Sequence, residues 1–293
     1  MIEALPRPTV ARAAGTAIRS RHVGHALLHG VLILGALTCL VPFLWMVSTS
    51  FKTAATVVSI PPQFIPHPVV GDNYVRVFTV APMVRYFLNS VGVVTVIVAG
   101  QLLSNSLAAY AFARLTFRGR DALFFAYLGT MMIPSQVTLI PSFILMKDLG
   151  WIDTYFALTV PFMLGSAFGT FLLRQSFLTI PAELEQAATI DGCGYLRLYA
   201  RIALPLSKPA LATFGVFSFL FFWNDFLWPL IVTNSDEHKT LQVGLVTIAQ
   251  NYFGTDWGSL MAGTVVSVVP MVLIFLFAQR YFVQGIALTG LKG

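Results

Sequence analysis

Long apolar runs with almost no charged side chains constrain this chain more than any other feature. The first extends from about His25 to Met46 and contains no Lys, Arg, Asp or Glu. About 20 apolar residues in a helix cross a bilayer core, where backbone polar groups must be paired within the protein. With 57% hydrophobic and 10% charged residues, the sequence predicts an all-α polytopic membrane protein. Six transmembrane helices are expected, at about 25–46, 86–113, 122–146, 154–173, 209–232 and 257–279.

Outside one six-helix domain (23–282), the sequence predicts two tails and one long outer segment. Residues 1–22 carry four arginines among Ala, Pro and Thr, which is typical of a mobile tail. Residues 283–293 are glycine-rich and too short to form a domain. The segment 47–84 holds several prolines, so we expect an extended chain with little regular structure, apart from a modest amphipathic piece after Asn73.

Two of the expected spans carry signals of irregular or close packing. Pro134 and Pro141 flank Gln136, so the third span should be kinked or locally unwound and face protein rather than lipid. Gln136 is then either a gate residue or a partner for backbone groups that the kink frees. In the fourth span, Gly165 and Gly169 form a small-xxx-small pattern that favours close helix packing.

A polar stretch at 174–208 separates the fourth and fifth spans. Pro181 suits a helix start, two glutamates follow it near the positive N-terminal end, and Gly192 can end the helix in a left-handed conformation. The pattern predicts a short helix, a glycine turn and a second helix. Ala187 and Ala188 lack bulk, so another protein surface could approach the backbone closely. We therefore expect a docking loop here, although an ordinary amphipathic interfacial helix would show part of the same pattern.

The distribution of Lys and Arg predicts the orientation of the chain. Thirteen of these residues fall on the side of the termini and the docking loop, and five fall on the other side. Since cytoplasmic loops are enriched in positive residues, both termini and the docking loop should be cytoplasmic. The smaller set comprises Lys52, Arg76, Arg85, Lys147 and Lys239. Topology explains the net charge of +6 better than nucleic-acid binding, because the basic residues are dispersed.

The docking loop resembles the cytoplasmic "EAA" coupling loop of ABC importer permeases. In that family Glu-Ala-Ala, three residues, Gly, nine residues and Ile-x-Leu-Pro recur, and Ala187-Ala188, Gly192 and Ile202-Ala-Leu-Pro205 fit this frame. Gln186 stands where the family has its glutamate, and Glu185 lies about 100° away around the helix. A neutral amide still forms hydrogen bonds, but weaker ones. The resemblance implies that an ATPase contacts Glu185, Gln186, Ala187, Ala188, Asp191 and Gly192.

Further motifs extend the resemblance over nearly the whole chain and make it specific to carbohydrate importer permeases of the maltose-system second-subunit kind. Such a subunit works in a bacterial-type inner membrane with a second homologous permease, an ABC ATPase dimer and an extracytoplasmic solute-binding protein. This chain has no P-loop, so ATP and Mg should be bound by the ATPase, with no cofactor on this subunit. The motifs are Ile133–Gln136, Phe222–Phe226, Thr255–Gly263, Gln279–Phe282 and Leu291–Gly293.

Two more contact sites follow from this resemblance. The outer loop with Asn251, Tyr252, Phe253 and Gly254 corresponds to one that enters the binding protein, and its aromatic residues suit a transient interface; a plain surface turn is the alternative. The ending Leu291-Lys292-Gly293 corresponds to a tail that inserts between the ATPases. Alternatively, Lys292 is only one of the cytoplasmic positive residues.

Asn224 and Asp225 are the candidate pathway residues besides Gln136, because a carboxylate in an apolar span is usually functional. They either bind sugar hydroxyls beside Trp223 and Trp228 or mark a helix break near the outer leaflet. The five histidines and two cysteines share no ligand spacing, so no metal site is expected.

The sequence favours a sugar importer, whose solute could be a mono-, di- or oligosaccharide. Glycerol phosphate or a polyol would use the same machinery, although no clear phosphate-binding Arg pair lies in a span. An ion-coupled carrier would need ionisable intramembrane residues or inverted repeats, and the spans are nearly uncharged. A membrane-embedded transferase would need a catalytic acid or metal carboxylates, which the sequence does not present convincingly.

Overall fold

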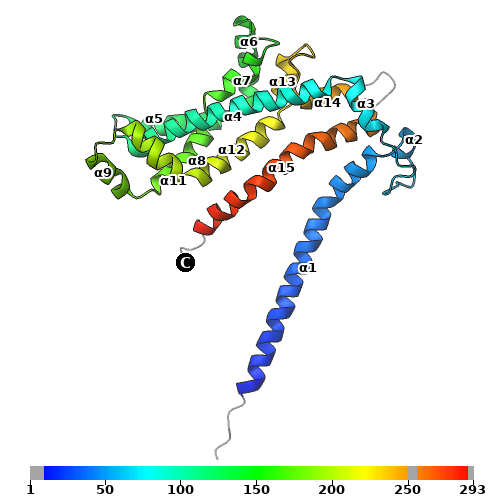
Figure 1. Cartoon of the computed structure of the whole chain (residues 1–293), viewed down its shortest axis with the longest axis horizontal. Helices are drawn as coiled ribbons and strands as arrows, with labels where there is room; N and C mark the ends of the chain where they lie inside the picture. Colours follow the sequence, from blue (N-terminus) through cyan, green and yellow to red (C-terminus); the bar gives the residue numbers. More distant parts are fainter. Residues whose placement is uncertain (1–9, 250–255, 290–293) are drawn as a thin grey trace, which may run out of the picture.

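The computed structural model describes residues 10–249 and 256–289, and its regular structure within these ranges is entirely helical (Figure 1). Three long helices dominate it: α1 (Val10–Ser50), α4 (Met83–Arg114) and α15 (Trp257–Thr289). In Figure 1, α12 (Lys208–Trp223) lies between α4 and α15, and α1 extends away from this group. The most apolar part of α1, within Leu27–Ser50, has no buried residue.

The all-α membrane fold is confirmed. Four helical stretches are long and apolar enough to cross a membrane: Leu27–Ser50, Met83–Arg114, Tyr155–Leu178 and Trp257–Gln279. Two further spans are bent pairs, Arg120–Met132 with Ser135–Asp148 at 95°, and Tyr195–Leu206 with Lys208–Trp223 at 78°, which gives up to six spans in the described chain.

The third span breaks where its prolines predict. Helix α5 (Arg120–Gly129) and the 3₁₀ turn η1 (Thr130–Met132) end at Ile133, and α6 (Ser135–Asp148) starts after Pro134. Ile133 is extended, with φ −83° and ψ 115°, because a residue that precedes proline is disfavoured in the helical region. The predicted local unwinding is therefore confirmed.

The fourth and fifth spans are broken as well. The fourth consists of α7 (Tyr155–Met163) and α8 (Ala167–Leu178), and the Ser166 hydroxyl caps α8 by accepting a hydrogen bond from Gly169 N. The fifth continues past α12 through an irregular turn at 224–226 into α13 (Leu227–Val232). The small-residue pattern thus serves a break and a close contact, since Gly169 packs against Asn105 and Phe214.

Several boundaries differ from the sequence-based expectations. The predicted extended segment contains the short helix α2 (Ala54–Val57), and α14 (Leu241–Ala249) was not expected, whereas α3 (Asp72–Val80) is the amphipathic piece expected near Asn73. The stretch 69–81 has no proline, so a helix can form there. Parts of the expected tails are helical, since 10–22 belongs to α1 and 283–289 to α15, and neither stretch contains a proline that would end the helix.

Helix α4 contributes to all three apolar clusters of the described core, through Tyr86, Ile97 and Tyr110 among others. Its polar side chains pair the backbone that the α7–α8 break leaves free. Gln101 Nε2 donates to Phe162 O (2.9 Å) and Asn105 Oδ1 accepts from Ser166 N (2.7 Å), on either side of the α7–α8 break. An unpaired backbone group in hydrocarbon would cost several kcal/mol.

We predict that Gly169→Val destabilises the protein by about 1–3 kcal/mol, the usual range for overpacking. A Cβ at Gly169 would lie 2.5 Å from Asn105 Nδ2 and still closer to Phe214, so α8 would have to move away from α4 and α12. Gly92→Val is the matched control, since a Cβ there meets nothing within 4 Å. Thermal unfolding of the purified protein should show a lower midpoint for Gly169→Val only; equal midpoints would contradict the packing argument.

Candidate functional site

The predicted docking loop has the predicted form. Helix α9 (Ala182–Ile190) begins after Pro181 and ends at a left-handed Gly192 with φ +81°. Hydrogen bonds from Gly192 N to Thr189 O and from Cys193 N to Ala188 O close the turn, both at 3.0 Å. Helix α10 (Tyr195–Leu198) then leads through the π-helical turn η2 (Tyr199–Ala203) and α11 (Leu204–Leu206) to the fifth span.

The outer surface of this loop is open and partly apolar. Gln186, Ala187, Asp191 and Gly192 are exposed, as the docking prediction requires. Large apolar side chains are exposed beside them: Ile190 is 87%, Tyr195 68% and Leu196 77% exposed. Since isolated soluble surfaces seldom leave such side chains together in water, this surface has the character of a protein interface.

Glu185 and Ala188 lie on the other side of α9. Ala188 is half-buried against the core cluster that contains Phe177 and Tyr199. Glu185 Oε1 lies 3.4 Å from Arg114 Nε, and the two side chains are only 15% and 12% exposed. Glu185 therefore faces the helices of its own chain rather than the exposed surface, which sequence spacing alone did not show.

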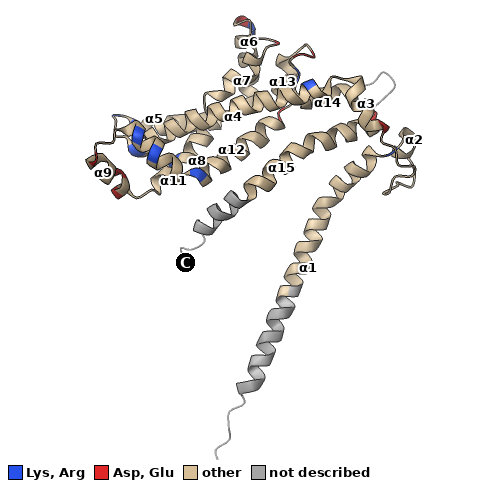
Figure 2. Cartoon of the chain, viewed as in Figure 1, with Lys and Arg blue, Asp and Glu red and all other residues tan. Residues whose placement is uncertain are grey.

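Figure 2 shows basic residues gathered at the α9 end of the molecule, around α5 and α11, with acidic residues on α9 itself. Arg174 lies over the Phe124 ring at 4.3 Å and donates from Nε to Phe112 O, so its charge also holds helices together. This accumulation agrees with the uneven Lys and Arg distribution of the sequence.

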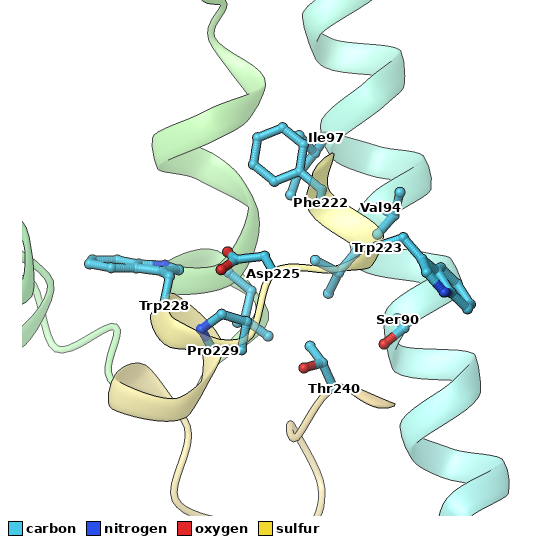
Figure 3. Close-up of a pocket in the computed structure, with 11 residues that line it drawn as sticks. Ser90, Val94, Ile97, Phe222, Trp223, Asp225, Trp228, Pro229 and Thr240 are labelled. Carbon is cyan, nitrogen blue, oxygen red and sulfur yellow. The ribbon is translucent and has the colours of Figure 1, made fainter. Parts of the chain in front are cut away.

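Asp225 lies in the α12–α13 break, beside the backbone amides of Leu227 and Trp228. It lines a cavity of about 10 Å³, which Figure 3 shows between α4, this break and the segment before α14. Such a volume holds about one water molecule and no sugar ring. Asn224 is exposed, and its side-chain amide donates to Leu220 O at 2.7 Å. The structure thus places both residues at a helix break, and half-buried Asp225 lines a cavity too small for a sugar ring.

Gln136 is exposed in the first turn of α6, and its side-chain oxygen accepts a long hydrogen bond of 3.5 Å from the Ser135 hydroxyl. Within the described chain no hydrogen bond joins Gln136 to backbone freed by the break, so the gate role is the prediction that stays open. The other predicted contact residues, 251–254 and 291–293, lie outside the described residues.

A polar cluster at the end opposite α9 was missed by sequence reasoning. Asp153, a left-handed residue with φ +59°, accepts hydrogen bonds from Asn234 N (3.0 Å), Ser235 N (3.1 Å) and the Ser235 hydroxyl (3.1 Å). Asp236 accepts from Tyr86 Oη (2.8 Å) and Lys239 Nζ (2.7 Å). The partners are about 80 and 150 positions apart in the chain, so no local pattern could reveal them.

No group of His, Cys, Asp and Glu among the described residues could hold a metal ion. The described side chains of the docking loop form hydrogen bonds, an ion pair and apolar contacts. Their arrangement suits a surface that binds another protein.

Comparison with known proteins decides the family. Residues 104–288 match the family described as "Binding-protein-dependent transport system inner membrane component". The chain belongs to this family of ABC importer permeases. One relative of the permease is the arabinooligosaccharides transport system permease protein AraQ of Halalkalibacterium halodurans, 38% identical over 255 residues, which covers 86% of this chain and 91% of the relative. Another is the sn-glycerol-3-phosphate transport system permease protein UgpE of Brucella abortus, 34% identical, with 93% and 99% covered.

Among solved structures, the permease resembles a chain of a bacterial ABC transporter involved in the import of the acidic polysaccharide alginate. The TM-score is 0.79 at 26% identity, and the match covers 95% of this chain and 100% of that chain. The broken spans and the α9 loop described above are thus features of an inner-membrane importer permease.

We predict that Gly192→Val lowers solute uptake by the assembled transporter, because a β-branched residue with φ +81° is strained by about 1–2 kcal/mol and re-aims α9. Gly194→Val is the matched control: Gly194 is extended, with φ −79° and ψ 164°, and neither glycine has an atom within 4 Å of an added Cβ. Uptake should fall for Gly192→Val alone. Wild-type uptake by that variant would contradict the prediction.

We predict that the Asp153 cluster loses stability in acid. Burial alone would raise the pKa of Asp153. The hydrogen bonds from Asn234 and Ser235, together with nearby His238, have the larger opposite effect, so the pKa lies below its ordinary value of 3.8. The hydrogen bond from Lys239, and then that from Tyr86, lower the pKa of Asp236. For a lowered folded-state pKa, the stabilisation is complete above 3.8 and is lost as the pH falls through the folded pKa.

Thermal unfolding between pH 7 and pH 3 measures this effect. Asp153→Asn should remove on the order of 1 kcal/mol at neutral pH, because the cluster is partly open to water, and should flatten the acid decline. Asp148→Asn, at an exposed site on α6, is the control. An unchanged pH profile for Asp153→Asn would show that this carboxylate does not hold the loop.

Proposed function

We propose that this chain is one of two permease subunits of an ATP-driven importer that moves a neutral mono-, di- or oligosaccharide by alternating access. The observation that carries the proposal is the α9 loop, whose exposed Ile190, Tyr195 and Leu196 form an apolar docking surface next to the family's coupling motif. The similarity to an arabinooligosaccharide permease and to an alginate importer supports a carbohydrate as solute.

The docking surface fits an ABC ATPase subunit that lies on the cytoplasmic side. Closure of the ATPase dimer would move α9, and differential contacts in the two states would shift the spans between inward- and outward-facing forms. A shift from 1:99 to 99:1 needs about 5.5 kcal/mol, so several contacts must contribute and Gln186 in place of Glu need not abolish coupling. ATP and Mg would be bound by the ATPase, and this chain would perform no catalysis.

A second permease subunit is supported by surfaces that this chain leaves open. The most apolar part of α1 has no buried residue. A groove of about 400 Å³ between α4, α8 and α12 is lined mainly by phenylalanines, including exposed Phe168 and Phe221. Both surfaces suit packing against a second permease and lipid.

The remaining contacts follow from the orientation that the positive residues predict, with both termini in the cytoplasm. The loop of Tyr252 and Phe253 would then face an extracytoplasmic solute-binding protein. The terminal Leu291-Lys292-Gly293 would reach the ATPases, with Lys292 near acidic or phosphate groups.

Glycerol phosphate is the second candidate solute, because a glycerol-3-phosphate permease is 34% identical to this chain over 281 residues. A polyol would need no phosphate-binding cation and would resemble a sugar in its contacts. These solutes would leave the subunit composition and the coupling scheme unchanged.

We predict that proteoliposomes with this chain, its companion permease, the ATPase and the binding protein take up an oligosaccharide only when ATP is present on the ATPase side. An ATPase whose P-loop lysine is replaced should abolish uptake, which is the control for ATP coupling. Glycerol phosphate is tested in parallel, and its uptake in place of sugar would correct the solute. Uptake driven by an ion gradient without the ATPase would overturn the proposed function.

A further inference from the structure

Arg114 occupies the last position of α4, where the helix reaches the docking loop. The next residue, Leu115, is extended with φ −87° and ψ 146°, so α4 ends there. The Arg114 side chain is only 12% exposed, although it lies at the end of a helix. A guanidinium in such a position must find its partners within the chain.

The first partners of Arg114 belong to the end of α8. Nη2 donates to Phe177 O at 2.5 Å and also to Ile180 O. These carbonyls lie at and just beyond the last turn of α8, where backbone acceptors lack partners within the helix. A cation there also interacts favourably with the negative end of the helix. Arg114 therefore fixes the end of α8 to the end of α4.

The second partner is Glu185 of α9, with Nε 3.4 Å from Oε1. Neither of these two buried atoms forms a hydrogen bond within the described chain, so ion pairing is the interaction between them. Removing one charge of a buried pair leaves the other uncompensated. Arg114 thus joins three elements, α4, α8 and α9, through one side chain.

The second half of the loop is fastened to the same part of α4. Tyr199, which opens the π-helical turn η2, shares a 2.7 Å hydrogen bond with Ser106. Its ring lies 5.5 Å from that of Tyr110, which in turn meets Phe177 edge-on at 5.9 Å. Both limbs of the loop are therefore attached to the last turns of α4.

We propose that Arg114 and Glu185 are positioning residues that make α9 move as one rigid body with α4 and α8. This inference rests on the proposed function, in which α9 receives the movement of an ATPase. It gives Glu185 an internal role, whereas the exposed residues of α9 and α10 form the docking contact. Glu185→Gln removes the charge at nearly constant shape, and Glu183→Gln is the matched control on the exposed side of the same helix.

The first measurement is sugar uptake per ATP hydrolysed by the complete reconstituted transporter. Glu185→Gln should lower this ratio by about 5-fold or more, within the usual range of coupling energies, while ATPase subunits stay bound. Glu183→Gln should match the wild type. An unchanged ratio for Glu185→Gln would overturn the proposal. Loss of the ATPase subunits from the folded Glu185→Gln complex would also overturn it, because that loss would indicate a direct contact between Glu185 and the ATPase.

The second measurement does not depend on transport. After replacement of Cys39 and Cys193, spin labels at exposed Leu103 of α4 and exposed Thr189 of α9 report the distance between the two helices in the purified complex. The distance distribution should be broader for Glu185→Gln than for Glu183→Gln; equal widths would overturn the proposal even if uptake fell. If the solute is wrong, this measurement still tests the contact. If Glu185→Gln does not fold, Arg114→Gln, which removes the other charge of the pair, takes its place with the same expectations.

Discussion

The structure depends on the pairing of backbone polar groups wherever a membrane span is broken. Three of the expected spans contain irregular turns, at 133–134, 164–166 and 224–226. In hydrocarbon the freed N–H and C=O groups have no water to bind, so another part of the protein must pair them. Helix α4 does this at the turn of the fourth span, where Gln101 and Asn105 bind the backbone on either side of the break. The same helix also binds irregular backbone elsewhere, since Asn89 binds the carbonyls of Glu237 and Lys239 and Arg114 binds the end of α8.

This arrangement explains why irregular backbone and function occur together in the permease. A break bends or re-aims a span, and it persists only because fixed side chains on a neighbouring helix stabilise it. Helix α4, which pairs the break of the fourth span, ends in the contact to α9. A displacement of the docking loop would therefore reach the helix that contributes to all three core clusters.

Charged side chains form different kinds of contact at the two ends of the molecule. At the α9 end, basic residues predominate and Arg114 is nearly enclosed by helix ends. At the opposite end, acidic residues hold the loop around 233–240 to α4 and to the turn before α7. Solvent-exposed ion pairs contribute little to stability because water screens their attraction, whereas breaking a buried ion pair is strongly destabilising. The enclosed contact is thus better suited to transmit movement.

The sequence by itself determined the membrane class, the presence of long apolar helices, the break at Pro134 and the helix–glycine turn of the docking loop. These features depend on local composition and on residues with restricted or permissive backbones, which act within a few positions. It did not determine α14, the inward direction of Glu185, or the small cavity beside Asp225. Only the tertiary structure decided the first two, because their partners lie far away in the chain: Gly244 of α14 packs against Tyr86, and Glu185 meets Arg114. A side chain with a polar or charged group is turned inward only when such a partner is present to compensate for lost water, and no local pattern contains that information.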